Sequence, residues 1–191
     1  MSEVVVTYVP RGQTFNWSFH EQLSRFRSAS EQEAVMKELA ERGQAAFSLA
    51  VCEDQVVGYA LLVPPDEKER WAGLSYVTVM GALEVAPPYR RGGVAGRILQ
   101  ALFADEETVE DQVIIALEYC WHWDVTASGL DVYSYKHMLK ALLEQAGMEQ
   151  VYTDDADIRA HAANFMMARI GKQVSSDQMQ QFFYTANPRV F

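Results

Sequence analysis

Residues 83–97 read Leu83-Glu84-Val85-Ala86-Pro87-Pro88-Tyr89-Arg90-Arg91-Gly92-Gly93-Val94-Ala95-Gly96-Arg97, and this stretch decides the fold. It joins the end of a predicted buried strand to a glycine-rich turn that begins a helix. The first turn of a helix presents free backbone N–H groups at the positive end of its dipole. The small residues let a phosphate approach those groups, and the neighbouring arginines add positive charge. We therefore expect a pyrophosphate site here.

Length and composition limit the remaining possibilities. The chain has 191 residues, a size typical of one domain, so we expect a single domain over 1–191. Hydrophobic residues make up 49 %, which suffices for a core, and no apolar run is long enough to span a bilayer. The N-terminus lacks the pattern of a signal peptide, and two widely spaced cysteines suit a reducing compartment, so we expect a cytoplasmic protein without a membrane partner. A net charge of −10 disfavours nucleic-acid binding.

The order of the predicted elements indicates an α+β fold with a largely antiparallel sheet and one parallel crossover. Strands are expected over 4–9, 46–52, 56–63, 74–85, 113–119 and within 148–155. A helix is expected to end near Gly43, others to follow Gly96 and to cover about 131–146, and one to run from Asp155 and Asp157 to Gly171. The last twenty residues predict a short helix and a final strand, Phe-Phe-Tyr-Thr.

Two common nucleotide-binding loops do not fit the glycine-rich turn. Glycines at 92, 93 and 96 break the Gly-x-Gly-x-x-Gly spacing, and the chain has no Gly-Lys-Ser/Thr triplet. The pattern that fits is Arg-x-x-Gly-x-Ala, formed by Arg90, Gly93 and Ala95. With the preceding strand and Tyr89, it resembles the coenzyme A loop of the general-control N-acetyltransferase (GNAT) superfamily. The alternative is a glycine-rich helix start that binds no ligand.

Four further segments resemble one bacterial GNAT subfamily, which acts in acetoin utilisation. They are Phe-His-Glu-Gln-Leu-Ser-Arg-Phe-Arg (19–27), 82–90, Glu-Tyr-Cys-Trp-His-Trp-Asp (118–124) and 163–175. The resemblance implies acetyl-CoA as cosubstrate and acetylation of a lysine in AMP-forming acetyl-CoA synthetase, which this modification inactivates. Two alternatives stay open: a GNAT enzyme that acetylates a small amine, and a non-catalytic sensor that only binds acetyl-CoA.

The resemblance also implies where the coenzyme lies. In the GNAT fold, the strand before the glycine-rich loop diverges from its parallel neighbour, here 113–119, and the pantetheine arm lies in the gap. The main chain of Leu83 and Val85 would face the coenzyme, and a main-chain N–H would stabilise the oxyanion. The expected coenzyme-binding residues are Leu83, Val85, Arg90, Arg91, Gly92, Gly93, Val94, Ala95, Gly96, Arg97 and Asn164, the last on the predicted late helix.

Acetylation of a lysine also needs a group that removes a proton from the amine, because an unperturbed lysine is almost fully charged at neutral pH. Glu84 is the only charged residue in 74–89 and stands beside the expected thioester. Apolar neighbours should raise the pKa of a carboxyl there and improve it as a base. Glu118 and Asp124 are the reserve candidates. The alternative role for Glu84 is a structural ion pair with a loop arginine.

The acid that would protonate the leaving thiolate is not evident. Many GNAT members use a tyrosine four residues before a glycine in a late helix, but Leu143 precedes Gly147 and Met167 precedes Gly171. Tyr119, Tyr133 or Tyr135 could replace it, or the thiolate could leave unassisted.

The remaining polar and aromatic groups have structural explanations beside functional ones. Trp121-His122-Trp123-Asp124 indicates packing, with a wall of the lysine-entry channel as the alternative. Cys120 and His122 supply only two ligands, and the aspartates over 154–157 lack the glycine and glutamate of a calcium loop, so we expect no metal.

Overall fold

A β-hairpin forms the centre of the first of two units into which the contacts of the chain divide, Met1–Val63 with Met80–Ala104. The computed structural model describes residues 3–189. The hairpin strands β3 (Ala46–Cys52) and β4 (Gln55–Val63) are joined by Glu53 and Asp54, whose φ angles are 48° and 62°. Two successive positive φ values are typical of the two-residue turns that match the strand twist.

Three further strands complete the sheet of this unit. They are β1 (Val5–Val9), antiparallel to β3, β2 (Ser18–Phe19), parallel to β4, and β5 (Val77–Val85), which neighbours β4. β5 contributes Met80 to Val85 to this unit and its first three residues to the other.

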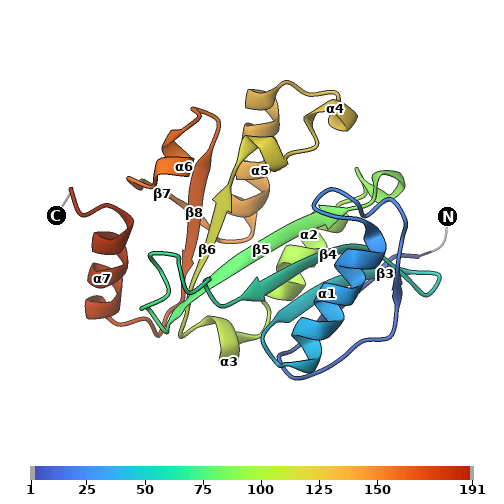
Figure 1. The fold of residues 1–191 in the computed structure, drawn as a ribbon, viewed down its shortest axis with the longest axis horizontal. Helices are drawn as coiled ribbons and strands as arrows, with labels where there is room; N and C mark the ends of the chain where they lie inside the picture. The colour runs from blue at the N-terminus through green and yellow to red at the C-terminus, as the bar shows by residue number, and fades with distance from the viewer. Residues whose placement is uncertain (1–2, 190–191) are drawn as a thin grey trace. The chain divides into compact units, whose positions relative to one another are not determined.

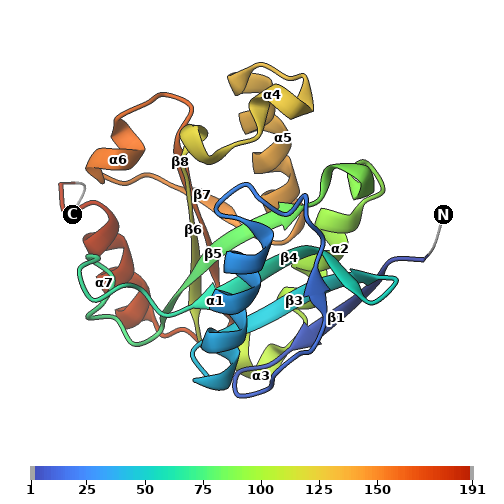
Figure 2. The ribbon, with the colours of Figure 1, turned by 45° about the vertical axis from the view of Figure 1, so that its right-hand side comes forward.

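Helices cover both faces of this sheet, as Figures 1 and 2 show for α1 (Ala29–Glu41) and α2 (Val94–Leu102). Side chains alternate between the faces along a strand. Tyr59 therefore packs in one apolar cluster with Met36 of α1, whereas Gly58 lies close to Ile98 of α2. The short helix η1 (Pro87–Tyr89) connects β5 to the loop before α2.

The second unit, Pro64–Val79 with Asp105–Phe191, has its own strand order, β5-β6-β8-β7. β6 (Val113–Glu118) is parallel to β5 along Val77–Val79 and antiparallel to β8 (Phe165–Ile170) along its whole length. β7 (Glu149–Val151) pairs with the outer edge of β8. The parallel ladder joins only three residues of each strand, as the expected divergence of β5 and β6 requires. Mixed pairing with flanking helices confirms the predicted α+β class.

Two longer helices lie on opposite sides of β6 and β8, α5 (Val132–Gln145) and α7 (Ser176–Ala186) (Figures 1 and 2). The remaining helices are one turn long: α3 (Glu106–Val109), η2 (Cys120–His122), α4 (Val125–Ser128) and α6 (Ala156–Arg159). Within residues 3–189 no helix has the length and apolarity needed to cross a membrane.

Two expectations for the C-terminal part are wrong. The helix predicted to run to Gly171 ends at Arg159, and the segment after it forms β8. Its apolar residues suit either structure, and pairing with β6 decides for the strand because it satisfies the β6 backbone. The predicted final strand Phe-Phe-Tyr-Thr lies inside α7, whose N-terminus has a capping box of Ser175 and Gln178.

Smaller differences concern two element boundaries. The strand expected from residue 74 begins at Val77, because Leu74 accepts a turn hydrogen bond from the Val77 N–H. The helix after the glycine-rich turn ends at Leu102, and α3 follows as a separate turn.

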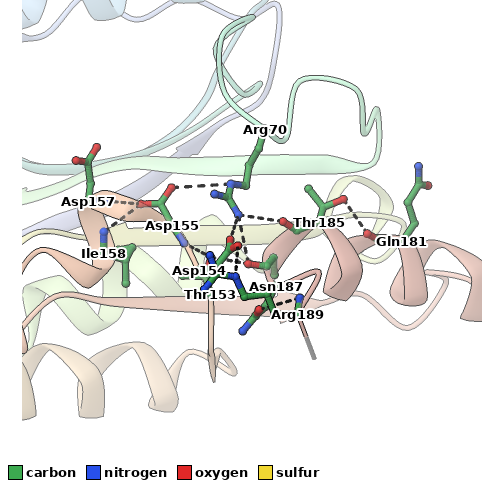
Figure 3. A network of polar contacts seen from close by, with 11 residues as sticks. Arg70, Thr153, Asp154, Asp155, Asp157, Ile158, Gln181, Thr185, Asn187 and Arg189 are labelled. Atoms are coloured by element: carbon green, nitrogen blue, oxygen red, sulfur yellow. Dashed lines mark hydrogen bonds and ion pairs between the residues drawn. The ribbon is translucent and has the colours of Figure 1, made fainter. Parts of the chain in front are cut away.

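Arg70 anchors an irregular segment of the second unit to its C-terminal helix (Figure 3). Its Nη1 donates to Asp154 Oδ1 at 2.6 Å and to the carbonyl oxygens of Thr185 and Ala186 at 3.2 and 3.4 Å. Beside it, Trp71 is buried and its ring centroid lies 5.4 Å from that of Phe182. An ionic and an apolar contact therefore hold this segment together.

Gly171, which follows β8, lies in close contact with the main chain of Glu110, before β6. A Cβ at Gly171 would overlap the main chain of Glu110, so Gly171→Ala should lower the free energy of unfolding by ~1–3 kcal/mol or more. The matched control is Gly73→Ala, because a Cβ at Gly73 meets nothing within 4 Å. Urea denaturation of both variants measures the difference, and equal stabilities would contradict the contact.

Candidate functional site

The glycine-rich loop has the open backbone that an anion site needs. Gly93 is the N-cap residue of α2, with a φ of 70°, and Arg91 before it has a φ of 69°. A Cβ at Gly92 or Gly93 would meet nothing within 4 Å, so the space above the loop is free of protein atoms in the described residues. The first-turn N–H groups of 94–96 have no acceptor within the helix. The loop thus offers several donors in one direction.

The three arginines of the loop have different surroundings. The Arg90 Nε donates to the carbonyl oxygen of Val85 at 2.8 Å, which fixes the end of β5. The Arg97 guanidinium donates to the carbonyl oxygen of Val4 at 3.0 Å but is otherwise exposed. Arg91 is exposed at the tip of the turn. A guanidinium has five N–H donors, so the exposed Arg91 and Arg97 can present donors to an anion.

The other predicted loop residues form the base of this site. Val94 is buried, and Ala95 and Gly96 are partly buried on the first turn of α2. Leu83 is partly buried and Val85 buried on β5. The first unit therefore brings together the whole predicted stretch from Leu83 to Arg97.

Glu84 is a buried carboxylate on β5, with 6 % of its surface exposed. Its Oε1 accepts the main-chain N–H of Arg25 at 2.9 Å, and its Oε2 accepts the Tyr59 hydroxyl at 2.9 Å. Burial, followed by the charge of Glu84, raises the pKa of Tyr59 far above its usual range, so Tyr59 stays a neutral donor. These two donors, rather than the loop arginines, are the partners of Glu84 and hold it in one orientation.

Glu118 is the last residue of β6 in the second unit, and its carboxyl has a raised pKa. Burial raises its pKa to about 7, an effect that the hydrogen bond from the Trp123 indole only partly offsets. That Nε1–Oε2 distance is 3.2 Å. The surroundings are aromatic, since Trp123 stacks on Tyr135 and lies near Phe165, the residue opposite Glu118 on β8. The residue as a whole is partly exposed, although its carboxyl group is buried.

Asn164 was expected on a helix, but it lies immediately before β8. Its side chain is buried, and both ends of its amide have partners within the second unit. Oδ1 accepts the Cys120 N–H at 2.8 Å, and Nδ2 donates to the Asp157 carbonyl oxygen at 2.8 Å. Asn164 therefore fixes the turn that follows Glu118.

The tyrosines proposed as acids differ in exposure. Burial, with smaller contributions from nearby carboxylates, raises the pKa of Tyr119 to about 12. Tyr133 is half exposed on α5, and Tyr135 stacks on Trp123. Leu143 lies on α5, and Met167 lies on β8, so the second of the two helical positions considered for this acid does not exist.

The residues of the Trp121-His122-Trp123-Asp124 segment differ in exposure. Trp123 is buried and packs, as predicted, whereas 51 % of Trp121 is exposed. Asp124 stands at the N-terminus of α4, beyond the end of β6. Among residues 3–189, no three His, Cys, Asp or Glu side chains are grouped so that they could hold a metal ion.

Sequence patterns missed the two groups that donate hydrogen bonds to Glu84. Tyr59 precedes Glu84 by 25 residues and resembles any apolar residue of a buried strand, so nothing in the sequence pairs it with Glu84. The Arg25 contribution is a main-chain N–H, which has no sequence signature. Trp123 was visible, because it lies five residues after Glu118 in the same short segment.

The sequence of the chain is similar to known families over most of its length. Residues 13–120 match the profile of the Acetyltransferase (GNAT) family. Two curated relatives, both named acetoin utilization protein AcuA, come from Bacillus licheniformis and Bacillus subtilis. They are 34 % and 33 % identical over 168 residues, which is 87 % of this chain and 80 % of each relative.

Solved structures agree with the sequence comparisons. The crystal structure of an acetoin utilization protein from Exiguobacterium sibiricum superposes with a TM-score of 0.87 and 27 % identity, covering 99 % of this chain and 97 % of that one. A GNAT phosphinothricin acetyltransferase from Sinorhizobium meliloti, in complex with AcCoA, shares the fold, with a TM-score of 0.52 and 16 % identity over 76 % of this chain and 71 % of that one.

Proposed function

Because the chain belongs to the GNAT acetyltransferase family, we propose that it transfers the acetyl group of acetyl-CoA to a lysine of AMP-forming acetyl-CoA synthetase. N-acetyltransferase activity follows from the family itself. The single observation that supports the narrower role is similarity to acetoin utilization proteins along most of the chain.

Coenzyme binding is proposed for the loop and strand end of the first unit. The first-turn N–H groups of α2 and the guanidinium groups of Arg91 and Arg97 would bind the pyrophosphate. Leu83 and Val85 would offer main-chain groups to the pantetheine and the thioester. Open space at Gly92 and Gly93 supports this proposal, because phosphate oxygens must approach the main chain closely.

The reaction requires a neutral amine. Its lone pair attacks the thioester carbonyl carbon, the C–N bond forms, and collapse of the tetrahedral intermediate breaks the C–S bond and releases the thiolate of coenzyme A. The proton lost by the amine passes to a base, and a main-chain N–H stabilises the oxyanion.

Two carboxylates are candidates for that base. Glu84, predicted from the sequence, is oriented firmly by Tyr59 and Arg25. Glu118 has a pKa near neutrality, the property expected of a base that works near pH 7. These properties favour Glu118 for proton transfer and Glu84 for positioning the strand. Asn164 supports Glu118 by fixing the turn that follows it.

The phosphate-binding role of the loop can be tested at Gly93. Gly93→Leu should weaken acetyl-CoA binding about tenfold or more, because its side chain would occupy the space above the donors. Gly129→Leu is the matched control, since Gly129 also has a left-handed φ, 72°, and open surroundings, but lies at the end of α4. Isothermal titration measures both affinities. If both variants bind acetyl-CoA equally well, the loop assignment is wrong.

The base can be identified from pH dependence. Since a base acts only when deprotonated, kcat/KM should rise steeply with pH up to about 7 and less steeply above it. Glu118→Gln should lower kcat ~10²-fold or more and abolish this bend, with acetyl-CoA affinity unchanged. If Glu84→Gln instead causes that loss while Glu118→Gln retains the bend, the base is Glu84.

The proposed substrate is tested by intact-mass spectrometry. Purified AMP-forming acetyl-CoA synthetase, incubated with this protein and acetyl-CoA, should gain one acetyl group on a single lysine and lose activity. Reactions without acetyl-CoA or with the Glu118→Gln variant are the controls. No gain in mass, with acetyl-CoA binding intact, would contradict this substrate and direct the search to small amines or to a sensor role.

A further inference from the structure

An exposed aromatic stack follows the end of β6. The rings of Tyr119 and Trp121 lie 5.0 Å apart with an interplanar angle of 15°, and His122 meets both edge-on at 5.7 and 6.0 Å. Trp121 is 51 % exposed, in contrast to the buried Trp123 two residues later. The stack therefore contributes a preformed indole surface to the outside of the second unit rather than to its core.

Such a surface has a defined preference for ligands. The face of an indole ring is electron-rich and attracts ammonium and guanidinium groups, while its apolar area gains by being covered. Because Tyr119 supports one face of Trp121, the ring is held in place before any ligand arrives, which reduces the entropy lost on binding.

The charges around the stack have one dominant sign. After burial, the carboxylates of Asp155, Asp157, Glu69 and Glu118 are the causes that raise the pKa of Tyr119, so their field extends over the stack. Arg70 lies 4.0 Å from one of these acids, Asp155, and forms an ion pair of 2.6 Å with the neighbouring Asp154. The chain as a whole carries a net charge of −10.

Asp157 is the carboxylate best placed to act outward. Its main-chain N–H donates to Asp155 Oδ1 at 3.0 Å and its main-chain carbonyl oxygen accepts from Asn164 Nδ2 at 2.8 Å, while Figure 3 shows its carboxylate pointing away from Arg70. The residue is exposed, and among the described residues no ion pair with it is found.

We propose that Tyr119 and Trp121, with Asp157, form a docking surface for a basic segment of the protein substrate, in which a lysine or arginine flanks the acceptor lysine. The stack begins at the residue after Glu118, so a flanking cation bound there would direct the neighbouring acceptor lysine to that carboxylate. This inference rests on the proposed acetylation of a protein lysine and adds what the enzyme recognises beside that lysine.

Two acceptor peptides test the surface. Each has one lysine and blocked termini; one carries arginines two residues before and after the lysine, and the other carries citrulline there, which has the same shape without the charge. Arginine accepts no acetyl group, so the two peptides differ only in docking. We expect kcat/KM to be about three- to tenfold higher for the arginine peptide, and this ratio to fall as salt is added.

Variants locate the preference on the protein. Trp121→Ala and Asp157→Asn should each reduce the arginine-to-citrulline ratio towards one. The matched controls are Tyr184→Ala and Asp177→Asn on α7, since Tyr184 is 57 % exposed and Asp177 is exposed. These controls should keep the wild-type ratio.

A binding measurement separates this inference from the proposed function. Fluorescein-labelled copies of both peptides, with acetyl-lysine in place of the acceptor, cannot react, and fluorescence anisotropy reports their affinities. Tighter binding of the arginine copy that is lost in Trp121→Ala supports the surface even if no peptide is acetylated, an outcome that would overturn lysine acetylation instead. Equal acetylation and equal binding of the two peptides would overturn the docking surface and leave the proposed function intact.

Discussion

The antiparallel ladder between β6 and β8 is the interaction on which the second unit depends. A buried strand must satisfy its backbone polar groups on both edges; β8 pairs with one edge of β6 along all six residues, whereas β5 pairs with the other edge only along Val113–Ile115. The same pairing places Phe165 opposite Glu118 and brings Asn164 to the turn that follows, so the surroundings of that carboxyl result from the ladder.

Glu84 and Glu118 have the same side chain but differ in the hydrogen-bond donors around their carboxyl groups. Glu84 has a hydroxyl and a main-chain N–H directed at its two oxygens, and it lies almost fully inside the first unit. Glu118 has one indole donor among aromatic rings, and its pKa is accordingly raised to about 7. Burial with one donor places the pKa of Glu118 near neutrality, whereas the two hydrogen bonds of Glu84 join β5 to β4 and to the main chain at Arg25.

Much of the first unit could be predicted from the sequence, because its signals are local. The hairpin around Glu53 and Asp54 and the strand end at Val85 depend on turn chemistry and on short apolar runs, although the helix expected after Gly96 begins at Val94. The helix predicted up to Gly171 was wrong because the choice between helix and strand for Phe165–Ile170 depends on β6, about fifty residues earlier. The partners of Glu84 and the exposure of Trp121 are long-range properties too, and no spacing of residues encodes them.

The anchoring of Arg70 and Trp71 has a consequence for the order in which the chain can fold. Arg70 and Asp154 are 84 residues apart, and the carbonyl oxygens that Arg70 also binds belong to the last turn of α7. Contacts of such sequence separation close late, because the entropy of a long loop must be lost first. During synthesis on the ribosome, the segment around Arg70 therefore emerges long before its partners, and the second unit completes its packing only after α7 has been made.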